Sequence, residues 1–266
     1  SGSILRWVPA SNGERHIWIP LSNIPEIIRS AFISAEDHRF YSHPGVDVLA
    51  ILRAVKSNLT KGHIVSGAST LTQQLSRLTY PRKRTYYDKL VELIRSLRIE
   101  GLLDKEQILE LYLNKVPLGN NLVGVKAGSM VYFGKILSRL TASEAALLAS
   151  LPKAPGKLNP YGRNAPLLIE RKNWVLNKMH INGHISFDIL NVSLQDTPIL
   201  KPKSFPFGAP HFINQVLPVS GNGNITTTID LKLQSRVEQI LKSHQFRLKR
   251  KTAHQASVVI LNNRDS

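Results

Sequence analysis

Two neighbouring carboxylates, Glu36 and Asp37, begin a short polar segment that continues through a Pro-Gly turn. Apolar residues between positions 24 and 35 recur at helical spacing, so a helix is expected to end at this acidic pair. The C-terminal end of a helix carries partial negative charge, so two carboxylates placed there need other stabilising partners. Two interpretations follow: the acids pair locally with His38 and Arg39, or one of them accepts a proton in catalysis.

A second stretch, residues 67–74, brings small residues to the expected start of a helix. Thr70 is followed three positions later by Gln73, a capping-box pattern that predicts a helix beginning directly after Thr70. A helix start preceded by small residues such as Ser69 is also suited to binding phosphate oxygens. Capping alone leaves Gln74 unexplained, and capping and phosphate binding are compatible with each other.

Charged residues gather in a third stretch, after a basic loop that ends at Arg84. The apolar spacing predicts a helix over residues 86–101, with Lys89 and Glu92 within reach of each other on one flank. Asp88 and Glu92 are four residues apart and repel each other by about 0.2–0.5 kcal/mol unless basic neighbours compensate. These charges form either a solvated helix flank or a site for an anion.

The composition limits the possible classes of protein. The chain has 266 residues, of which 42% are hydrophobic, enough for one large domain and a small additional one. It has no cysteine, which excludes disulfides and thiolate metal sites. Its formal net charge of +17 requires an anionic partner: nucleic acid, a membrane surface or a polyanionic substrate. Zinc-finger spacing, an RNP block and a basic zipper are all missing, so no nucleic acid is expected.

Two further patterns are rejected as sites. Ser150 and Lys153 match the Ser-x-x-Lys pattern of penicillin-reactive enzymes, but this serine is expected to end a helix and no Lys-Thr-Gly follows. His38 and His43 lie around the same turn and could suggest a metal pair. Histidine is not the usual ligand for magnesium or manganese held by phosphate oxygens, so no metal site is assigned to them.

Five blocks of sequence, in the same order, resemble the five motifs of the family 51 glycosyltransferases, the peptidoglycan polymerases. They are residues 35–47, 67–75, 77–92, 105–114 and 171–176. The family occurs as the glycan-polymerising module of class A penicillin-binding proteins and as monofunctional transglycosylases. The resemblance spans about residues 15–180. The Pro-rich stretch over residues 200–217, followed by Thr-Thr-Thr-Ile-Asp, is most similar to penicillin-binding proteins of the 1C type.

The resemblance implies a mainly α fold, with a lysozyme-like helical glycosyltransferase domain over residues 1–183. A Pro-rich linker is expected over residues 184–222. Residues 223–266 are expected to form a small α+β fragment, the truncated start of a transpeptidase domain, with a strand at residues 225–229. In the family a membrane anchor precedes the catalytic domain. This implies a place at the bacterial inner membrane, with the catalytic domain on the periplasmic or extracytoplasmic face.

The resemblance also implies roles for single residues. Glu36 matches the general base of the family, and Glu92 matches its second acidic, catalytic residue. The residues that match substrate-binding positions are Asp37, Phe40, Ser69, Thr70, Gln73, Gln74, Arg77, Arg84 and Lys89. No protein metal ligand is expected, whereas a divalent metal, Mg²⁺ or Mn²⁺, could bridge the substrate pyrophosphate. The family usually has arginine directly before this lysine, where the present chain has Asp88, so this flank is less positive than usual.

The implied reaction polymerises lipid II. The 4-hydroxyl of an incoming unit attacks the anomeric carbon of the lipid-linked growing glycan strand, and the anomeric centre is inverted. A base must take the hydroxyl proton, and clustered cations can stabilise the departing pyrophosphate in place of a general acid. The expected partners are lipid II, the glycan strand, the membrane surface and other cell-wall synthesis proteins. Two alternatives remain: glycan cleavage, as in lytic transglycosylases or lysozyme, and an inactive scaffold that binds glycan or lipid.

Overall fold

The computed structural model describes residues 4–61, 69–81, 85–206, 208–220, 225–249 and 258–260. Its contacts divide the chain into two compact units: a large unit formed by residues 9–204, and a small unit formed by residues 1–8 together with residues 205–266. Among the residues expected to bind substrate, Arg84 lies outside the described ranges.

The large unit consists mainly of helices, which confirms the fold class predicted from the sequence. Its α-helices are α1 (Glu26–Glu36), α2 (Val48–Lys61), α3 (Leu71–Thr79), α4 (Tyr86–Leu102), α5 (Lys105–Lys115), α6 (Val125–Gly128), α7 (Ala142–Ser150), α8 (Ala165–Ile181) and α9 (Phe187–Gln195). Its single-turn segments are η1 (Leu21–Asn23), η2 (Phe40–Ser42), the π-helical η3 (Ser129–Phe133), η4 (Leu137–Arg139) and η5 (Leu151–Lys153). Two short strands, β1 (Arg15–His16) and β2 (Leu122–Val123), pair in parallel. No helix within the described ranges is both long and apolar enough to cross a bilayer.

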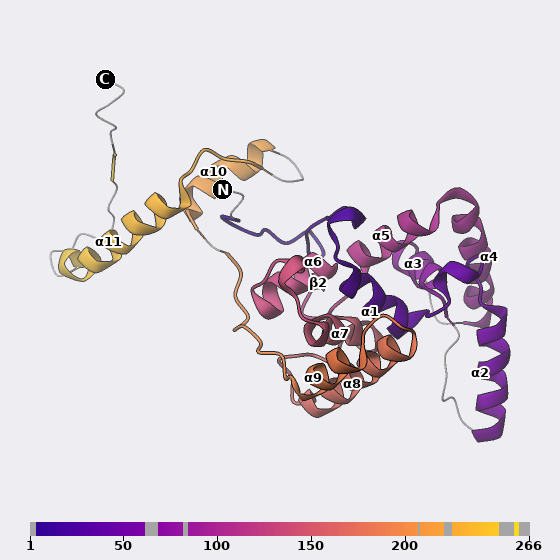
Figure 1. Cartoon of the computed structure of the whole chain (residues 1–266). Coiled ribbons are helices and arrows are strands. Elements are labelled where there is room, and N and C mark those ends of the chain that lie inside the picture. The colour runs from indigo at the N-terminus through magenta and orange to yellow at the C-terminus, as the bar shows by residue number, and fades with distance from the viewer. Residues whose placement is uncertain are drawn as a thin grey trace. The chain divides into compact units, whose positions relative to one another are not determined.

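Helix α1 lies between the other helices of the large unit (Figure 1). Its apolar face, which includes Ile28, Ala31 and Phe32, is fully buried, and α1 packs against α7 and α8. On the other side of the unit, α3 packs against α4 and α5. Burial of a large side chain such as Phe32 stabilises the fold by about 1.5–3 kcal/mol. Because α1 ends at Glu36, this packing fixes the position of the acidic pair.

Three helices begin with the capping boxes predicted from the sequence. Thr70, Asp104 and Thr141 each accept a hydrogen bond from the backbone N–H three residues later, and the side chain of that later residue bonds back to the cap. Loss of such a cap costs about 0.5–2 kcal/mol. The Thr70 hydroxyl also donates to the carbonyl oxygen of Gly45 at 2.6 Å. This bond ties the start of α3 to the polar segment that follows α1.

Helix α5 holds the extended segment that leads into α1. The fully buried side chain of Asn114 donates to the carbonyl oxygen of Ile19 and accepts from its N–H, both at 2.8 Å. Glu110 accepts from the N–H of Leu21 at 2.7 Å. These bonds satisfy backbone groups of a segment that has no strand partner at these positions.

A buried lysine fixes the position of α8. Lys172 is 1% exposed, and its Nζ donates to the carbonyl oxygens of Ser193 at 3.0 Å and Asp196 at 2.5 Å, and to Ser143 Oγ at 3.3 Å. The carbonyl groups lie at the C-terminal end of α9, where partial negative charge compensates a buried ammonium. Lys172 thereby joins α7, α8 and α9.

The small unit contains two helices within the described ranges, α10 (Pro210–Ser220) and α11 (Leu231–Lys249). Trp7 packs edge-on against Phe205, with ring centroids 6.2 Å apart. The strand expected at residues 225–229 is not formed, because these residues have neither helical nor strand structure. A strand needs a partner for its hydrogen-bond ladder, and the described part of this unit offers none.

Candidate functional site

Glu36 and Asp37 lie at the C-terminal end of α1, as the sequence predicted, but they have different surroundings. Glu36 is the last residue of the helix. Asp37 is the C-cap and leaves helical geometry, with φ −159° and ψ 73°. This change in backbone direction gives the two adjacent carboxylates separate partners. The two carboxylates therefore have to be treated separately.

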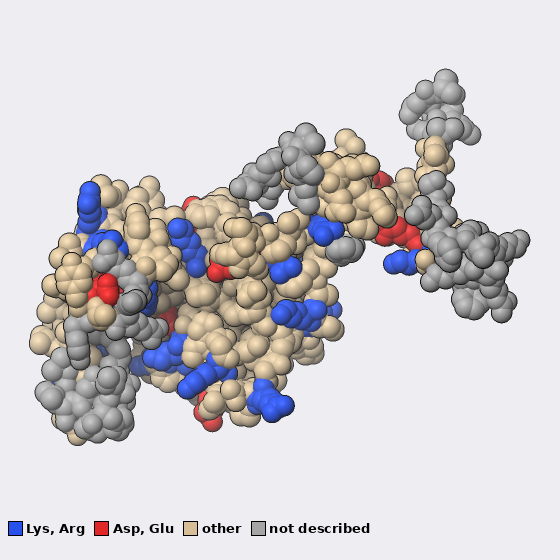
Figure 2. Space-filling view, turned by 180° about the vertical axis from the view of Figure 1, so that it is seen from behind, with Lys and Arg blue, Asp and Glu red and all other residues tan. Residues whose placement is uncertain are grey.

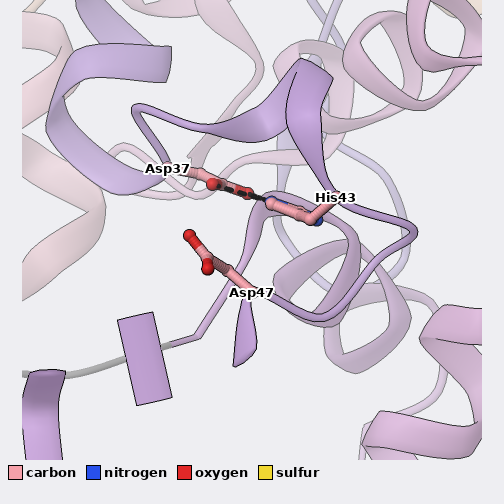
Figure 3. A group of neighbouring side chains, drawn as sticks. All are labelled: Asp37, His43 and Asp47. Carbon is pink, nitrogen blue, oxygen red and sulfur yellow. Dashed lines mark hydrogen bonds and ion pairs between the residues drawn. The ribbon is translucent and has the colours of Figure 1, made fainter. Parts of the chain in front are cut away.

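Asp37 is buried and holds the loop that follows α1 (Figure 3). Its carboxylate accepts a hydrogen bond from the N–H of Leu71 at 2.9 Å and lies 3.0 and 3.1 Å from Nε2 of His43. The Nδ1 atom of His43 accepts from the N–H of Gly45 at 3.2 Å, so the neutral ring carries its proton on Nε2 and donates it to Asp37. Asp37 thus joins the end of α1, the loop and the start of α3.

Asp47 completes a buried acidic group with Asp37 and His43 (Figure 3). One ligand atom from each residue lies within 4.8 Å of the others, so the group could hold a metal ion. All three are already bonded within the protein: Asp47 accepts from the N–H of Ala50 at 2.9 Å and lies 3.6 Å from NH1 of Arg39. A metal would have to displace the bonds that hold the loop. We therefore assign Asp37, His43 and Asp47 to the structure of the loop. Arg39 pairs with Asp47, whereas the sequence suggested that it pairs with Glu36 or Asp37.

Glu36 presents one unpartnered carboxylate oxygen in a buried position. Its Oε2 accepts from Nε2 of Gln74 at 2.8 Å, whereas its Oε1 is buried and has no hydrogen-bond partner among the residues that the structure describes. Burial raises the pKa of Glu36 above the usual 4.5, and the Gln74 hydrogen bond and nearby cations oppose this rise. A buried acceptor without a donor is costly, by about 1–3 kcal/mol. A substrate hydroxyl that donates to Oε1 would remove this cost.

Three cations from different elements act on Glu36: Arg77 of α3, Lys153 of η5 and Arg171 of α8. Arg171 donates to a carbonyl oxygen in the last turn of α1 at 3.4 Å, and its guanidinium lies 3.8 Å from the ring centroid of Trp174. The sequence analysis assigned neither Arg171 nor Lys153 to the site. The signal for Arg171 was its place in the last of the five sequence blocks. Lys153 has no such signal, because its position follows from the packing of α7 against α1.

A second charged group lies where α3 and α4 pack together. The Nζ of Lys89 donates to Glu92 Oε1 at 2.5 Å and to Ser69 Oγ at 2.9 Å, and NH1 of Arg77 lies 3.5 Å from Glu92 Oε2. The side chains of Arg77 and Lys89 are 39% and 49% exposed, whereas that of Glu92 is 11% exposed. Glu92 thus holds two cations that remain open to an anion from solvent. Arg84, which was expected here, lies outside the described residues.

Several residues predicted to bind substrate are buried and have partners within the fold. Phe40 is fully buried, with Nζ of Lys105 4.5 Å from its ring centroid, and its contact with substrate stays a prediction. Thr70 and Gln73 are buried and form the cap of α3, and Asp37 holds the loop. These side chains hold the elements around the candidate site and are buried away from solvent. The described candidates that keep some exposure are Ser69, Gln74, Arg77 and Lys89.

Asp88, the departure from the family pattern, belongs to the N-terminal cap of α4. Thr85 Oγ1 accepts from the N–H of Asp88 at 3.0 Å and lies 2.6 Å from its carboxylate oxygen. An acid in the first turn of a helix is stabilised by the helix dipole, by about 0.3–1 kcal/mol. This local role explains why an acid is accommodated beside Lys89.

The surface of the large unit is rich in basic side chains. On the face shown in Figure 2, Lys and Arg recur across this unit with acidic side chains only scattered among them. This distribution agrees with the formal net charge of +17 for the whole chain. Such a surface attracts anions over a distance of about 8–10 Å at physiological ionic strength.

The sequence was compared with known proteins. Residues 1–180 match the family model described as Transglycosylase. Penicillin-binding protein 1C of Escherichia coli (strain K12) is 38% identical over 235 residues, which cover 87% of this chain and 30% of that protein. Penicillin-binding protein 1A of the same strain is 39% identical over 250 residues, covering 88% of this chain and 29% of that protein.

Among solved structures, penicillin-binding protein 1A from Haemophilus influenzae is similar, with a TM-score of 0.45 and 25% sequence identity. The match covers 80% of this chain and 24% of that chain. The chain spans about 30% of the length of the curated relatives named above. The family model covers residues 1–180, well over half of the chain, and includes all five sequence blocks. The chain therefore belongs to the transglycosylase family, the family 51 peptidoglycan glycosyltransferase domain of class A penicillin-binding proteins.

Proposed function

We propose that this chain polymerises lipid II into glycan strands with inversion at the anomeric carbon, and that Glu36 is the general base. The observation that carries this proposal is the buried Oε1 atom of Glu36, which has no hydrogen-bond partner within the described part of the chain, whereas Oε2 accepts from Gln74. An acceptor 4-hydroxyl would donate to Oε1 and pass its proton there as its oxygen attacks the anomeric carbon. Positioned general bases of this kind contribute about 10²–10⁴-fold to a rate.

We assign the stabilisation of the leaving lipid pyrophosphate to Arg77 and Lys89, the cations that pair with Glu92. Arg77 and Lys89 are partly exposed and already oriented by the Glu92 carboxylate, so they need little reorganisation when charge develops on the pyrophosphate. Ser69 adds a hydroxyl beside Lys89. We include Arg84 in this assignment on the family resemblance alone. The pyrophosphate leaves as an anion stabilised by these groups, so no general acid is required.

A divalent metal, Mg²⁺ or Mn²⁺, is proposed to be held by the pyrophosphate oxygens and not by a dedicated protein site. The two carboxylate oxygens of Glu92 face Lys89 and Arg77, so a second cation there would meet two like charges. The described residues around Glu92 therefore do not fit a metal as its principal ligands. Magnesium commonly keeps several waters and binds through substrate phosphates.

The two alternative functions fit the site less well. An enzyme that cleaves glycan acts on a substrate without pyrophosphate and has no use for exposed cations such as Arg77 and Lys89 beside its acid. An inactive scaffold has no need to keep a carboxylate oxygen of Glu36 buried and unpaired, at a cost in stability.

The setting of the reaction follows from the same chemistry. Lipid II and the lipid-linked strand reside in a membrane, and the basic surface of the chain is attracted to anionic headgroups, by about 1 kcal/mol for each cation near the surface. We propose that the chain works at the extracytoplasmic face of the bacterial inner membrane, with other cell-wall synthesis proteins as further partners.

The product formed from lipid II tests the proposed function. Incubation of the chain with lipid II is expected to yield polymer that muramidase digests, and the released lipid should carry the pyrophosphate. Incubation with preformed glycan strands is expected to leave their length unchanged. Shortened strands would indicate a cleaving enzyme, and binding of lipid II without turnover would indicate a scaffold; either result overturns the proposal.

The pH dependence of the reaction provides an independent prediction. Glu36 must be ionised to accept a proton, and burial raises its pKa above 4.5. Activity is therefore expected to rise with pH through a midpoint above 4.5, in contrast to an exposed glutamate. Initial rates at saturating lipid II, measured from acidic to neutral pH with unfolding monitored in parallel, give this midpoint. A midpoint at or below the usual value would argue against a buried base.

A further inference from the structure

Tyr112 lies behind the residue that bonds to Glu36. It is located on α5 and fully buried, with its hydroxyl oxygen 3.2 Å from Oε1 of Gln74. The Nε2 atom of the same amide donates to Glu36 at 2.8 Å. The ring of Tyr112 packs edge-on against Phe32, with centroids 6.3 Å apart and planes at 73°, so the core of the fold fixes the position of the hydroxyl.

The direction of these two hydrogen bonds is set by the carboxylate. An ionised Glu36 can only accept, so Gln74 must present its NH₂ group to it and its carbonyl oxygen to Tyr112. The tyrosine hydroxyl is then the donor. Burial, followed by the charge of Glu36, raises the pKa of Tyr112 well above its usual value, so the hydroxyl keeps its proton at any working pH.

An amide that lacks this donor has two orientations of nearly equal shape, related by exchange of its oxygen and nitrogen. In the wrong orientation the Gln74 oxygen would face the Glu36 carboxylate, and the two acceptors would repel each other. In the right orientation Oε2 of Glu36 is satisfied and Oε1 is the atom left without a partner.

We propose that Tyr112 is a positioning residue for the reaction at Glu36: it locks the Gln74 amide in one orientation, which holds the carboxylate with Oε1 free for the acceptor hydroxyl. This inference rests on the proposed function, because it assumes that Glu36 is the base. The Tyr112 hydroxyl bonds to Gln74, and Gln74 bonds to Glu36, so Tyr112 acts on the carboxylate through Gln74.

The other charged groups around Glu36 are expected to stay in place when Tyr112 is changed, because they are held by other elements. They are Arg77 of α3, Lys153 of η5 and Arg171 of α8, with Asp37 following in the chain and acting on Tyr112. Within the described residues, none of them forms a hydrogen bond to Tyr112. A change in the behaviour of Glu36 on removal of the Tyr112 hydroxyl therefore reports on the Gln74 link.

Tyr112→Phe tests the proposal in the full chain with lipid II as substrate. Loss of one neutral hydrogen bond is expected to lower kcat by about 3- to 10-fold, with KM changed by less than about twofold. The acid limb of the pH profile should also move to higher pH, because the Gln74 hydrogen bond lowers the pKa of Glu36 and a less firmly held amide lowers it less. Damage to the fold alone would not move this limb.

Tyr132→Phe is the matched control. Tyr132 is also fully buried, and its hydroxyl donates to the carbonyl oxygen of Leu118 at 2.6 Å, among residues that do not contact Glu36. The Tyr132 hydroxyl also accepts from Asn120 at 3.1 Å, so this variant should lower the melting temperature at least as much as Tyr112→Phe does. Its pH limb and kcat are expected to match those of the wild type.

Gln74→Met keeps the proposal testable if Tyr112→Phe does not fold. It removes the link itself and is expected to shift the acid limb in the same direction. In the Gln74→Met background, Tyr112→Phe should cause no further shift, which is the non-additivity expected of residues that act in series. An unchanged limb in both single variants, or fully additive effects, would overturn the role of Tyr112 while wild-type polymerisation continues. Failure of the wild type to polymerise lipid II would instead overturn the proposed function.

Discussion

Replacement of Glu36 by Gln is expected to lower the rate of lipid II polymerisation by about 10²–10⁴-fold, the contribution typical of a positioned general base. Gln has nearly the shape of Glu and can still accept from Gln74, but it cannot take a proton from the acceptor hydroxyl. The cations assigned to the pyrophosphate are untouched, so KM should change little. Initial rates with labelled lipid II at neutral pH measure the effect.

The same substitution is expected to raise thermal stability at neutral pH. Because the pKa of Glu36 is raised in the folded protein, the folded state binds this proton more tightly than the unfolded state does. Wild-type stability is therefore lost as pH rises through the window from 4.5 to the raised value, and Gln is free of this loss. Melting temperatures of both proteins should diverge at neutral pH and converge below that window. A variant that is inactive and also less stable at neutral pH would contradict this account of Glu36.

Replacement of Lys89 by Ala is expected to lower kcat by about 10²–10³-fold, the usual effect of removing one preorganised donor to developing charge. Lys89 is half exposed and donates to Glu92 and Ser69, so its ammonium is open to an incoming phosphate. An exposed ion pair of this kind contributes only about 0–1 kcal/mol to folding. The loss of activity should therefore far exceed the loss of stability, as measured by rates and melting temperatures on one preparation.

Arg98→Ala is a matched control for Lys89→Ala. Arg98 is an exposed residue of the same helix, α4, and its removal takes away the same formal charge outside the group held by Glu92. Arg98 is nine positions after Lys89 on α4, about 13 Å along the helix axis. Rates within about twofold of the wild type are expected, because exposed charges separated by more than a Debye length are largely screened. Equal losses in both variants would mean that general charge attraction, and not stabilisation of the leaving group, accounts for the effect.

Much of the fold could be predicted from apolar spacing and capping patterns, which are short-range features of the sequence. The end of α1 at Glu36 follows from its apolar spacing, and the starts of α3, α5 and α7 follow from Thr70, Asp104 and Thr141 with their capping partners. Each of these features depends on residues within one or two turns of each other, which a sequence displays directly.

Features that depend on distant segments were not predictable in the same way. Arg171 reaches the end of α1 from a helix more than a hundred positions later, and only the packing of α8 brings it there. Likewise, the partner of Asp37 is His43 because the loop closes on itself, whereas the nearer His38 and Arg39 looked equally suitable in the sequence. The strand expected at residues 225–229 required a pairing partner that composition cannot supply.

The carboxylate of Asp37 links Glu36, the proposed proton acceptor, to α3, the helix that carries part of the proposed phosphate site. Asp37 follows Glu36 directly in the chain, and its carboxylate accepts a hydrogen bond from the N–H of Leu71, the first residue of α3. The same helix carries Gln74 and Arg77. If α3 moves when the lipid substrate binds, either this hydrogen bond breaks or the backbone of Glu36 moves with the helix. Because Gln74 of the same helix also donates to Glu36, a shift of α3 would act on this carboxylate through its side chain and its backbone together.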